Sequence, residues 1–384
     1  MARADTVVYI YPMAKWVSFR SIAESHIKEL RKYYNVQTFD EESATIVFTI
    51  LLYTYSPPII LHPFFYPIAR YEKILKQKLS RIQNIIGVDV ADSTHITEYA
   101  VQLTENAEAL IVPSNFSKNA YVSSGCKKPI YVVNHGVPDE WIGRIIDKPK
   151  ALKQLLDYKR ESGKKLIQTW AMHSWYRKGE DLAYEVFNKL VEERNDVALV
   201  VRKPGSIDVY DSKIAYSTIE GSNTSPLTVN ARPKLSILSL WLEDYKIEEL
   251  MSICDIFLLT SRGGGFEHPP LLAMSKGEVA IGARGGAWED YIPQWLLIDS
   301  HQSLQILPGN PIHDGVGVEI EVEKAVDKLH EIIDNMDEYK SRIAEYVNEK
   351  IREEFTWSKI GLKLKEIIGR YIYELTGKPV PSIR

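Results

Sequence analysis

A glycine loop in the second half of the chain has the residue types and the order of an anion-binding site. The run Ser261-Arg-Gly-Gly-Gly-Phe-Glu267 follows an apolar stretch, residues 255–260, that reads as a buried strand. It precedes a helix that Pro269 can begin and Gly277 can end. Backbone N–H groups and the positive end of that helix dipole then point at one place, where a phosphate can bind. A plain glycine turn between two core elements is the alternative, since such turns are common at strand–helix junctions.

Two basic residues stand where they can complete such a site. Lys178 is at the start of a helix expected over 179–193, where the helix dipole disfavours a lysine that lacks an anionic partner. Arg202 follows the strand expected at 197–201, at the edge where parallel sheets bind ligands. Basic side chains and main-chain amides can neutralise a diphosphate there in place of a metal. A solvated lysine and a surface arginine are the alternatives.

Metal-binding residue types are not convincingly grouped along the chain. Asp89, Asp92 and His95 form the nearest cluster, and we expect neither a metal nor another cofactor there. Cys126 and Cys254 are far apart and lack metal-type spacing, so free thiols in a reducing compartment are expected.

Length and composition narrow the class of protein. A chain of 384 residues predicts two domains. Its net charge of -4 and pI near 6.2 argue against a nucleic-acid partner, which usually requires a basic excess. We see no signal peptide and no apolar run of the roughly 20 residues that span a bilayer, so a cytoplasmic protein is expected. Abundant Lys, Glu and Arg with 2 Cys favour a thermophilic source.

The elements that position these residues follow from alternating apolar and amphipathic stretches. Strands in the first half are expected at 6–10, 36–39, 44–52, 84–89, 109–113 and 130–133. Strands in the second half are expected at 166–170, 197–201, 235–242, 255–260, 279–281 and 296–299. Helices between successive strands indicate parallel pairing and doubly wound sheets. A charged segment, 147–165, reads as the linker, and 203–234 fits either a hairpin or an ordered loop.

Seven short segments match, in order, the patterns of one enzyme family. They are 112–117, 134–137, 176–187, 247–261, 264–274, 285–289 and 355–358. Residues 264–274, for instance, resemble the pattern EGFGLPPLEAM, and residues 285–289 resemble GGxxE. From about residue 107 to 376 the chain is therefore similar to the family 4 retaining glycosyltransferases of the GT-B fold. Residues 1–105 match only in general pattern, and the family's first glycine-rich loop is absent from them.

The resemblance implies an α/β protein with two Rossmann-like, doubly wound domains facing across a cleft and a C-terminal helix crossing back to the first domain. We expect an acceptor-side domain at 1–155 with the helix 358–384, and a donor-binding domain at 156–357. The implied activity is transfer of a sugar from a nucleotide-diphosphate sugar, metal-independent and with retention of the anomeric configuration. The resemblance leaves open whether the acceptor is a glycan, a lipid or a protein.

The resemblance also implies roles for individual residues. Lys178 matches the family lysine that holds the donor diphosphate. The full set of expected donor-binding residues is Lys178, Arg202, Gly264, Gly265, Phe266, His268 and Glu289. In the family a histidine of the first domain faces the donor sugar, and here His95 is the preferred candidate and His62 the alternative.

Three family positions hold other residues in this chain. The two family glutamates fall on Gly264 and Leu272, so neither carboxylate is in its usual place. Glu267, near the first of these positions, either takes over the catalytic role or only satisfies the helix dipole. The donor-site arginine falls on Met172, with 173–174 beside it as substitutes.

Two further hypotheses follow from the same residues. The missing glutamates favour a degenerate GT-B protein that binds a sugar nucleotide or glycan without transfer, whereas the motif order argues against an epimerase or phosphorylase. The basic, aromatic run 64–81 is suited to rest on an anionic lipid surface, which would place the protein at the periphery of a membrane. A solvated helix face is the alternative for that run.

Overall fold

The computed structural model describes residues 5–15, 17–51, 57–79, 84–144, 146, 148–172, 174–218, 227–239 and 244–376. The chain divides into two compact units, each with its own central sheet. Unit 1 comprises residues 1–136, 309–314 and 354–384, and unit 2 comprises residues 137–308 and 315–353. Across the described ranges, every helix is too short or too polar to traverse a lipid bilayer.

The sheet of unit 1 is parallel, with the strand order β2-β1-β3-β4-β5-β6. Its strands are β1 (Thr6–Tyr11), β2 (Asn35–Asp40), β3 (Ile59–Leu61), β4 (Ile85–Val88), β5 (Ala109–Val112) and β6 (Ile130–Val132). The central strands are buried on both faces, as their continuous apolar runs predict. The order reverses between β1 and β3, and open sheets bind ligands beyond the carboxyl ends of strands at such a point.

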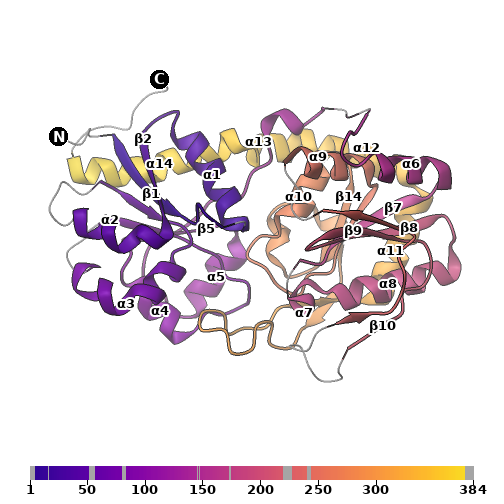
Figure 1. Ribbon diagram of the computed structural model, residues 1–384, viewed down its shortest axis with the longest axis horizontal. Helices are drawn as coiled ribbons and strands as arrows, with labels where there is room; N and C mark the ends of the chain where they lie inside the picture. The colour runs from indigo at the N-terminus through magenta and orange to yellow at the C-terminus, as the bar shows by residue number, and fades with distance from the viewer. Residues whose placement is uncertain are drawn as a thin grey trace. The chain divides into compact units, whose positions relative to one another are not determined.

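Helices cover both faces of this sheet (Figure 1). On one face, α1 (Ser18–Leu30) packs with α14 (Trp357–Thr376) in a core that includes Tyr9, Ile27 and Ile368. The other face carries α2 (Ala44–Leu51), α3 (Phe65–Leu79), α4 (Glu98–Thr104) and α5 (Asn115–Ser123). The last helix of the chain thus belongs to unit 1, which confirms the expected return of the C-terminal helix to the first domain.

The expected strand at 44–52 is wrong, because this stretch begins as the helix α2. Ala44 and Phe48 are buried one turn apart, whereas Ile46 and Ile50 on the same helix are exposed. The third strand is instead β3, which lies between β1 and β4. A short apolar run rich in β-branched residues fits both the helical and the strand period, so pattern alone misassigned it.

The sheet of unit 2 has the strand order β12-β9-β8-β7-β13-β14-β15. Its strands are β7 (Lys165–Trp170), β8 (Val197–Lys203), β9 (Ser206–Tyr210), β12 (Leu235–Leu238), β13 (Ile256–Leu259), β14 (Val279–Ala283) and β15 (Leu297–Ile298). Strand β9 runs antiparallel to β8 and β12, and the other neighbours are parallel. The first part of 203–234 is therefore a hairpin, whose turn Gly205 allows with a φ of 150°.

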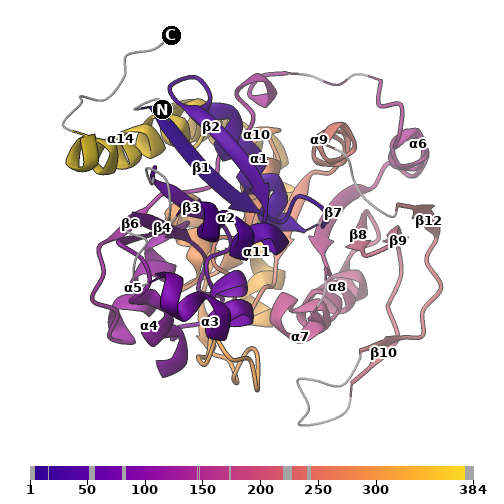
Figure 2. The same cartoon turned by 60° about the vertical axis from the view of Figure 1, so that its left-hand side comes forward.

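Helices also lie on both sides of this second sheet (Figure 2). α6 (Lys153–Ser162) and α9 (Asp244–Ile253) pack on one side, and α8 (Glu180–Glu193) lies on the other. Two short helices, α7 (Trp175–Lys178) and α10 (His268–Ser275), follow the carboxyl ends of β7 and β13. The remaining helices are α11 (Val322–Asp334), α12 (Met336–Tyr346) and α13 (Arg352–Glu354), with single turns η1 (Glu41–Ser43), η2 (Asp139–Trp141), η3 (Ala287–Asp290), η4 (Gln294–Leu296) and η5 (Val347–Ile351). The remaining strands are β10 (Tyr216–Ser217), β11 (Thr228–Val229), β16 (Ser300–Gln302) and β17 (Val318–Ile320).

The chain passes from unit 1 to unit 2 between residues 136 and 137, earlier than the boundary at 155 that composition predicted. Leu152 and Leu155 are buried in the core that α9 shares with β8, so α6 is part of unit 2. The Glu249 carboxylate of α9 also accepts three backbone N–H bonds from residues 150–152, at 2.8 to 2.9 Å. The charged segment is therefore docked on unit 2 rather than a free linker.

Candidate functional site

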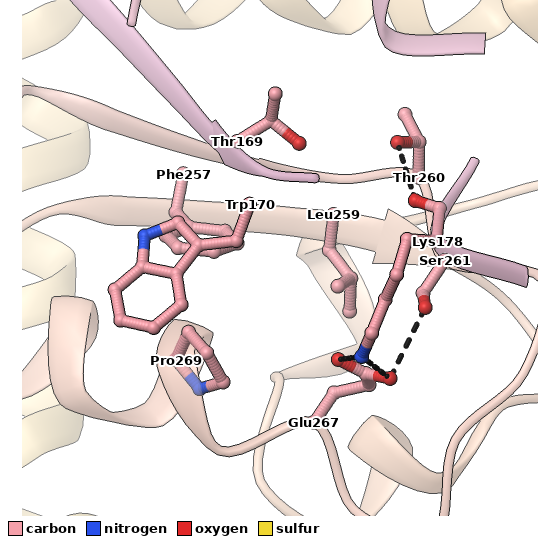
Figure 3. A pocket seen from close by; sticks show the side chains of 9 residues that line it. All are labelled: Thr169, Trp170, Lys178, Phe257, Leu259, Thr260, Ser261, Glu267 and Pro269. Carbon is pink, nitrogen blue, oxygen red and sulfur yellow. Dashed lines mark hydrogen bonds and ion pairs between the residues drawn. The ribbon is translucent and has the colours of Figure 1, made fainter. Parts of the chain in front are cut away.

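A small pocket lies at the carboxyl ends of two neighbouring strands of unit 2, β7 and β13 (Figure 3). Its walls are the ends of these strands, Lys178 at the end of α7, the glycine loop and the start of α10. Parallel strands present their carboxyl ends at one edge of a sheet, which is where such folds bind ligands. The loop that the sequence singled out thus forms one side of a concave site.

The pocket contains a partly buried ion pair between Lys178 and Glu267, drawn with dashed lines in Figure 3. The lysine Nζ lies 2.6 Å from one carboxylate oxygen of Glu267 and 2.7 Å from the other. The Ser261 hydroxyl donates to the first of these oxygens at 3.1 Å, and an Arg177 nitrogen is 3.8 Å from it. Two cations, one carboxylate and a hydroxyl therefore converge on one point at the edge of the sheet. Arg177 and Ser261 were not among the expected site residues. Both lie within segments that match the family patterns, Arg177 in 176–187 and Ser261 in 247–261.

Gly179 brings Lys178 to the glycine loop. It has a φ of 63°, and a Cβ at this position would lie 1.9 Å from the carbonyl oxygen of Thr260. Only glycine permits that approach of the α7–α8 junction to the end of β13. Bonds from the Thr260 hydroxyl to the Gly179 carbonyl, at 2.8 Å, and from the Arg262 N–H to the Arg177 carbonyl, at 2.7 Å, close the contact. Lys178 therefore ends the short helix α7, rather than beginning a longer one.

The Glu267 carboxylate occupies the space that a side chain at position 264 would fill. A Cβ built on Gly264 would lie 2.0 Å from Glu267 Oε1 and 2.8 Å from Cδ. The backbone of Glu267 is left-handed, with a φ of 58°, and Tyr291 holds it there by donating its hydroxyl to the Glu267 carbonyl. A left-handed glutamate is uncommon outside glycine-like positions, so surrounding contacts must maintain it. The carboxylate thus turns back toward the glycine loop instead of pointing away along α10.

Arg262 stabilises the glycine loop and was not predicted as a site residue. Its guanidinium is buried, lies 4.1 Å from the centre of the Tyr176 ring and donates to both Asp181 carboxylate oxygens at 2.8 and 2.7 Å. Glu319 accepts a further bond from its Nε. Burial alone would lower the pKa of Arg262, but the bonds to Asp181 and Glu319 outweigh it and raise the pKa. The fully paired arginine is a structural clamp between α8 and the glycine loop.

Arg202, the second expected cation, is buried near the end of β8. It is paired in the strand register with Trp170 of β7, and its guanidinium lies 4.6 Å from the centre of the Trp170 ring. One terminal nitrogen contacts the Met172 sulfur, and within the described ranges Nε has no hydrogen-bond partner. Burial lowers the pKa of Arg202 from 12.5 to about 10. Trp170 lines the pocket together with Lys178 and Glu267. Arg202 therefore contacts one of the side chains that form the pocket wall.

The other expected donor-binding residues lie on the two glycine loops. Phe266 packs its ring against Tyr291, with centroids 5.0 Å apart, and His268 begins α10 next to it. Glu289 accepts a bond from the Gly285 N–H at 2.6 Å, so its carboxylate holds its own loop. Leu272 is buried within α10.

Two further positions that the sequence raised lie next to the pocket in the chain. His173, offered as a substitute for the missing arginine, lies outside the described residues. Ser174 is left-handed, with a φ of 53°, and immediately precedes α7.

Both candidate histidines belong to unit 1 and differ in surroundings. His95 is exposed and its Nδ1 is 3.1 Å from the Thr94 hydroxyl. His62 is buried, lies 2.9 Å from the Tyr9 hydroxyl, and has a pKa well below its usual value because of burial and the nearby His26. His62 thus belongs to a buried polar cluster with Tyr9 and His26, where its contacts are structural.

Asp89, considered above for metal binding, follows β4 and places its carboxylate at the start of helix α3 of unit 1. Its carboxylate accepts the Phe65 and Val90 backbone N–H groups, each at 2.8 Å. Burial raises its pKa to about 7, although these backbone bonds act in the opposite direction. The residue therefore stabilises the start of α3.

Comparison with known sequences finds two viral relatives. The chain is 35% identical over 385 residues to the uncharacterized protein 356 of Sulfolobus islandicus rod-shaped virus 1, covering 95% of this chain and 99% of that protein. It is 25% identical over 256 residues to the putative glycosyltransferase 45 of a Sulfolobus islandicus filamentous virus, covering 64% of this chain and 62% of that protein. No family model matches.

Comparison with solved structures finds proteins of the same fold. HepE of Anabaena, solved in complex with UDP and glucose, superposes with a TM-score of 0.62 at 12% identity, over 95% of this chain and 99% of that one. A trehalose-6-phosphate structure from E. coli, bound with UDP-2-fluoro glucose, superposes with a TM-score of 0.63 at 11% identity, over 94% and 98% of the two chains. At these identities the likeness concerns the fold.

Proposed function

The chain belongs to the family of protein 356 of Sulfolobus islandicus rod-shaped virus 1 and has the GT-B fold, and from this premise we propose that it is a retaining glycosyltransferase using a nucleotide-diphosphate sugar. The observation that carries the proposal is the Lys178–Glu267 pair at the carboxyl edge of the unit 2 sheet. The similar viral protein named as a putative glycosyltransferase, and the similar folds solved with UDP and UDP-2-fluoro glucose, support it.

In this proposal the donor diphosphate binds at Lys178 and the start of α10. Lys178 presents a compact ammonium in the wall of the pocket, and Arg177 adds a second cation nearby. The glycine loop contributes backbone N–H groups, and the dipole of α10 favours negative charge at its beginning. Charge on the departing diphosphate is then stabilised by protein groups without a metal.

Glu267 is proposed as the carboxylate that stabilises the sugar. Its carboxylate lies against the Cβ position of residue 264, which matches the first glutamate of the resembling family, and this supports the assignment. The bond from the anomeric carbon to the diphosphate oxygen breaks, and the acceptor hydroxyl oxygen bonds to that carbon on the same face. The acceptor proton passes to the leaving diphosphate oxygen. Positive charge on the sugar during this exchange is offset by Glu267.

From unit 1 we propose His95 rather than His62 as the residue that meets the donor sugar. His95 is exposed in the loop after β4, whereas His62 is enclosed by Tyr9 and Phe19. Unit 1 is accordingly assigned to the acceptor.

A membrane contact of unit 1 is part of the proposal. Ile46 and Ile50 of α2 and Ile74 of α3 are 63%, 56% and 57% exposed, and α2 packs against α3. Lys73, which precedes Ile74 in α3, is also exposed, and exposed apolar and basic groups together favour binding to an anionic bilayer. Residues 80 and 81 of the run 64–81 lie outside the described residues. Sedimentation with phosphatidylglycerol vesicles, but not with phosphatidylcholine vesicles, is expected and should be lost in the variant Ile46→Asp/Ile50→Asp.

From composition we also propose that the protein is cytoplasmic and comes from a thermophilic source. Cys126 and Cys254 are free, which suits a reducing compartment. Asp255 pairs with Lys159 and Lys340, each at 2.8 Å, an ion-pair network of the kind that helps at high temperature. A thermal unfolding midpoint below 60 °C would contradict the thermophilic assignment.

The test of the function is release of nucleotide diphosphate from a panel of nucleotide sugars. We expect turnover with at least one donor, unchanged by EDTA, and a fall of 100-fold or more in Lys178→Ala and Glu267→Gln. Lys213→Ala is the matched control, because this lysine makes a surface pair with Glu192. An anomeric product analysis by NMR then tests retention.

The alternative is a GT-B protein that binds a sugar nucleotide or glycan without transfer. The buried apolar side chain of Leu272, where the family has its second glutamate, favours this alternative because it offers no ligand to a ribose diol. Saturable binding without turnover across donors and acceptors would select it. Flat isotherms with every uridine, guanosine, adenosine and thymidine diphosphate would reject the transferase and the nucleotide-binding form of the alternative, and would leave only glycan binding.

A further inference from the structure

One loop of the chain contributes to both units. Residues 303–317, which we call the arm, connect β16 to β17 of unit 2, but the tip of the arm, residues 309–314, is part of unit 1. Connections longer than about 12–15 residues are uncommon in compact domains and are usually functional or disordered. The arm is ordered throughout, and none of the family-like segments includes it, so the resemblance assigns it no role.

The tip of the arm is hydrogen-bonded to the loop that carries His95, next to the start of α4 (Figure 1). The Thr97 N–H donates to the Ile312 carbonyl at 2.9 Å, and the Asp314 N–H donates to the His95 carbonyl at 3.2 Å. The two residues enclosed by these bonds form an antiparallel bridge. The tip therefore fixes the backbone on which the exposed His95 side chain is mounted.

The tip has a defined shape and is anchored in unit 1. The Asn310 Oδ1 accepts the backbone N–H groups of Ile312 and His313 at 2.9 and 3.0 Å, the pattern by which asparagine fixes a turn. The Ile312 side chain packs against the core of unit 1. The Thr97 hydroxyl also donates to the Pro311 carbonyl at 2.6 Å. Packing and hydrogen bonds together hold the tip in place.

The base of the arm, where it joins β17, is hydrogen-bonded to the glycine loop of the proposed donor site. The Val318 N–H donates to the Arg262 carbonyl at 2.9 Å. Gly317 permits this approach, because a Cβ there would lie 1.8 Å from the same carbonyl oxygen. The Ile306 N–H donates to the Gly315 carbonyl at 3.2 Å, so the two limbs of the arm stay close together up to the tip.

We propose that the arm is a positioning element for sugar transfer, which holds the His95 loop by its tip while its base is fixed to the glycine loop that binds the donor. Hydrogen bonds, packed side chains and rigid elements are the means by which one site acts on another. The proposal rests on the proposed function, from which it takes the donor site and the role of His95. The arm itself contacts neither the sugar nor the diphosphate.

The experiment removes the tip and leaves the limbs on the glycine loop. Because the limbs are hydrogen-bonded at residues 306 and 315, a two-residue Asn-Gly turn can replace residues 307–314. We expect this tipless chain to bind UDP with unchanged affinity in calorimetric titration, since Lys178 and the glycine loop are retained. The kcat for nucleotide release should fall by about 10-fold or more, because misplacing a reacting group by about 1 Å can cost that much.

Single substitutions in the arm give a finer test. Ile312→Asp should detach the tip from the core and lower kcat as the deletion does. Leu304→Asp is the matched control, because Leu304 lies on a limb and is 63% exposed, and its kcat should equal that of the wild type. Asn310→Ala should also lower kcat, whereas Asn310→Asp keeps an oxygen that accepts both N–H groups and should retain it.

A double-mutant cycle shows whether the arm acts through His95. In the His95→Ala background, removing the tip should lower kcat by less than about 2-fold, because the side chain that the tip positions is already gone. A loss in that background as large as in the wild type would assign the tip a general structural role and overturn the proposal. Equal kcat in the tipless and wild-type chains would overturn it as well.

Hydrogen exchange reports on the arm without turnover. The Thr97 amide should exchange slowly in the wild type and faster in the tipless chain, and UDP should slow its exchange only when the tip is present. Equal Thr97 exchange in the two chains, or an effect of UDP that persists without the tip, would refute the link to the glycine loop. A wild-type chain that binds UDP but turns over no donor contradicts the transferase instead, and one that binds no nucleoside diphosphate contradicts both.

Discussion

Replacing Gly264 by alanine tests whether Glu267 has taken over the place of a side chain at that position. The new Cβ would lie 2.0 Å from Glu267 Oε1 and 2.8 Å from Cδ, both below any real carbon contact. The carboxylate must therefore move by about 1 Å or more, since non-bonded heavy atoms settle near 3.5 Å. That movement breaks its bonds to Lys178, at 2.6 and 2.7 Å, and to Ser261, at 3.1 Å.

The expected cost follows from those bonds. A hydrogen bond to a charged group contributes about 1.5–3 kcal/mol, and a buried group left unsatisfied costs a similar amount. Allowing for partial relaxation, the free energy of unfolding of Gly264→Ala should fall by about 2–4 kcal/mol. Nucleotide release should fall by about 100-fold or more, because the carboxylate no longer meets the donor sugar. Urea unfolding and the nucleotide-release assay measure the two effects.

A double-mutant cycle separates the clash from other effects of the added methyl group. With Glu267→Ala as the background, Gly264→Ala removes nothing further and should cost less than about 0.5 kcal/mol. A cost of 2–4 kcal/mol in that background would refute the steric argument. The exchange Gly264→Glu/Glu267→Gly presents a carboxylate from the other backbone position and is expected to recover measurable turnover. No recovery, in a variant that folds, would show that the carboxylates are not interchangeable.

Three other predictions concern stability. Arg262→Met should lower the free energy of unfolding by about 3–5 kcal/mol, because it leaves the Asp181 and Glu319 carboxylates without their cation. Denaturant unfolding measures this change. A loss below about 1 kcal/mol would contradict the role of Arg262 as a clamp between α8 and the glycine loop. Glu249→Gln should cost about 1–3 kcal/mol by the same assay, because a single amide oxygen cannot accept the three N–H bonds from residues 150–152. Burial lowers the pKa of His26 to about 3. Below about pH 6.5 the unfolded chain therefore binds a proton at His26 that the folded chain does not. The free energy of unfolding is then unaffected by His26 above that pH and falls as the pH is lowered below it. The loss of stability between pH 7 and pH 5 should therefore be about 2 kcal/mol smaller in His26→Gln than in the wild type, and identical pH profiles would contradict a neutral buried His26.

Much of the fold was readable from the sequence, because the signals concerned are local. The alternation of apolar strands with amphipathic helices predicted the central strands of both sheets, and the order of short motifs predicted the GT-B fold. The glycine loop and Lys178 could be predicted as site residues because a run of glycines and a lysine just before a helix are features of a few adjacent residues. The misassigned helix α2 shows the limit, since an eight-residue apolar run has no period long enough to separate helix from strand.

The residue order alone determined which types of side chain stand at which strand end, and from these we predicted an anion site at the edge of the second sheet. Tertiary structure alone decided that Glu267 meets Lys178 across 89 residues and that its carboxylate lies against the Cβ position of Gly264. It also decided that Arg202 is buried, with an Nε that has no hydrogen-bond partner in the part of the chain that the structure describes. The physical reason is the separation along the chain over which each interaction acts. Periodicity and capping act over a few residues, whereas these contacts depend on the close approach at Gly179 and on the packing of distant segments, which no local pattern records.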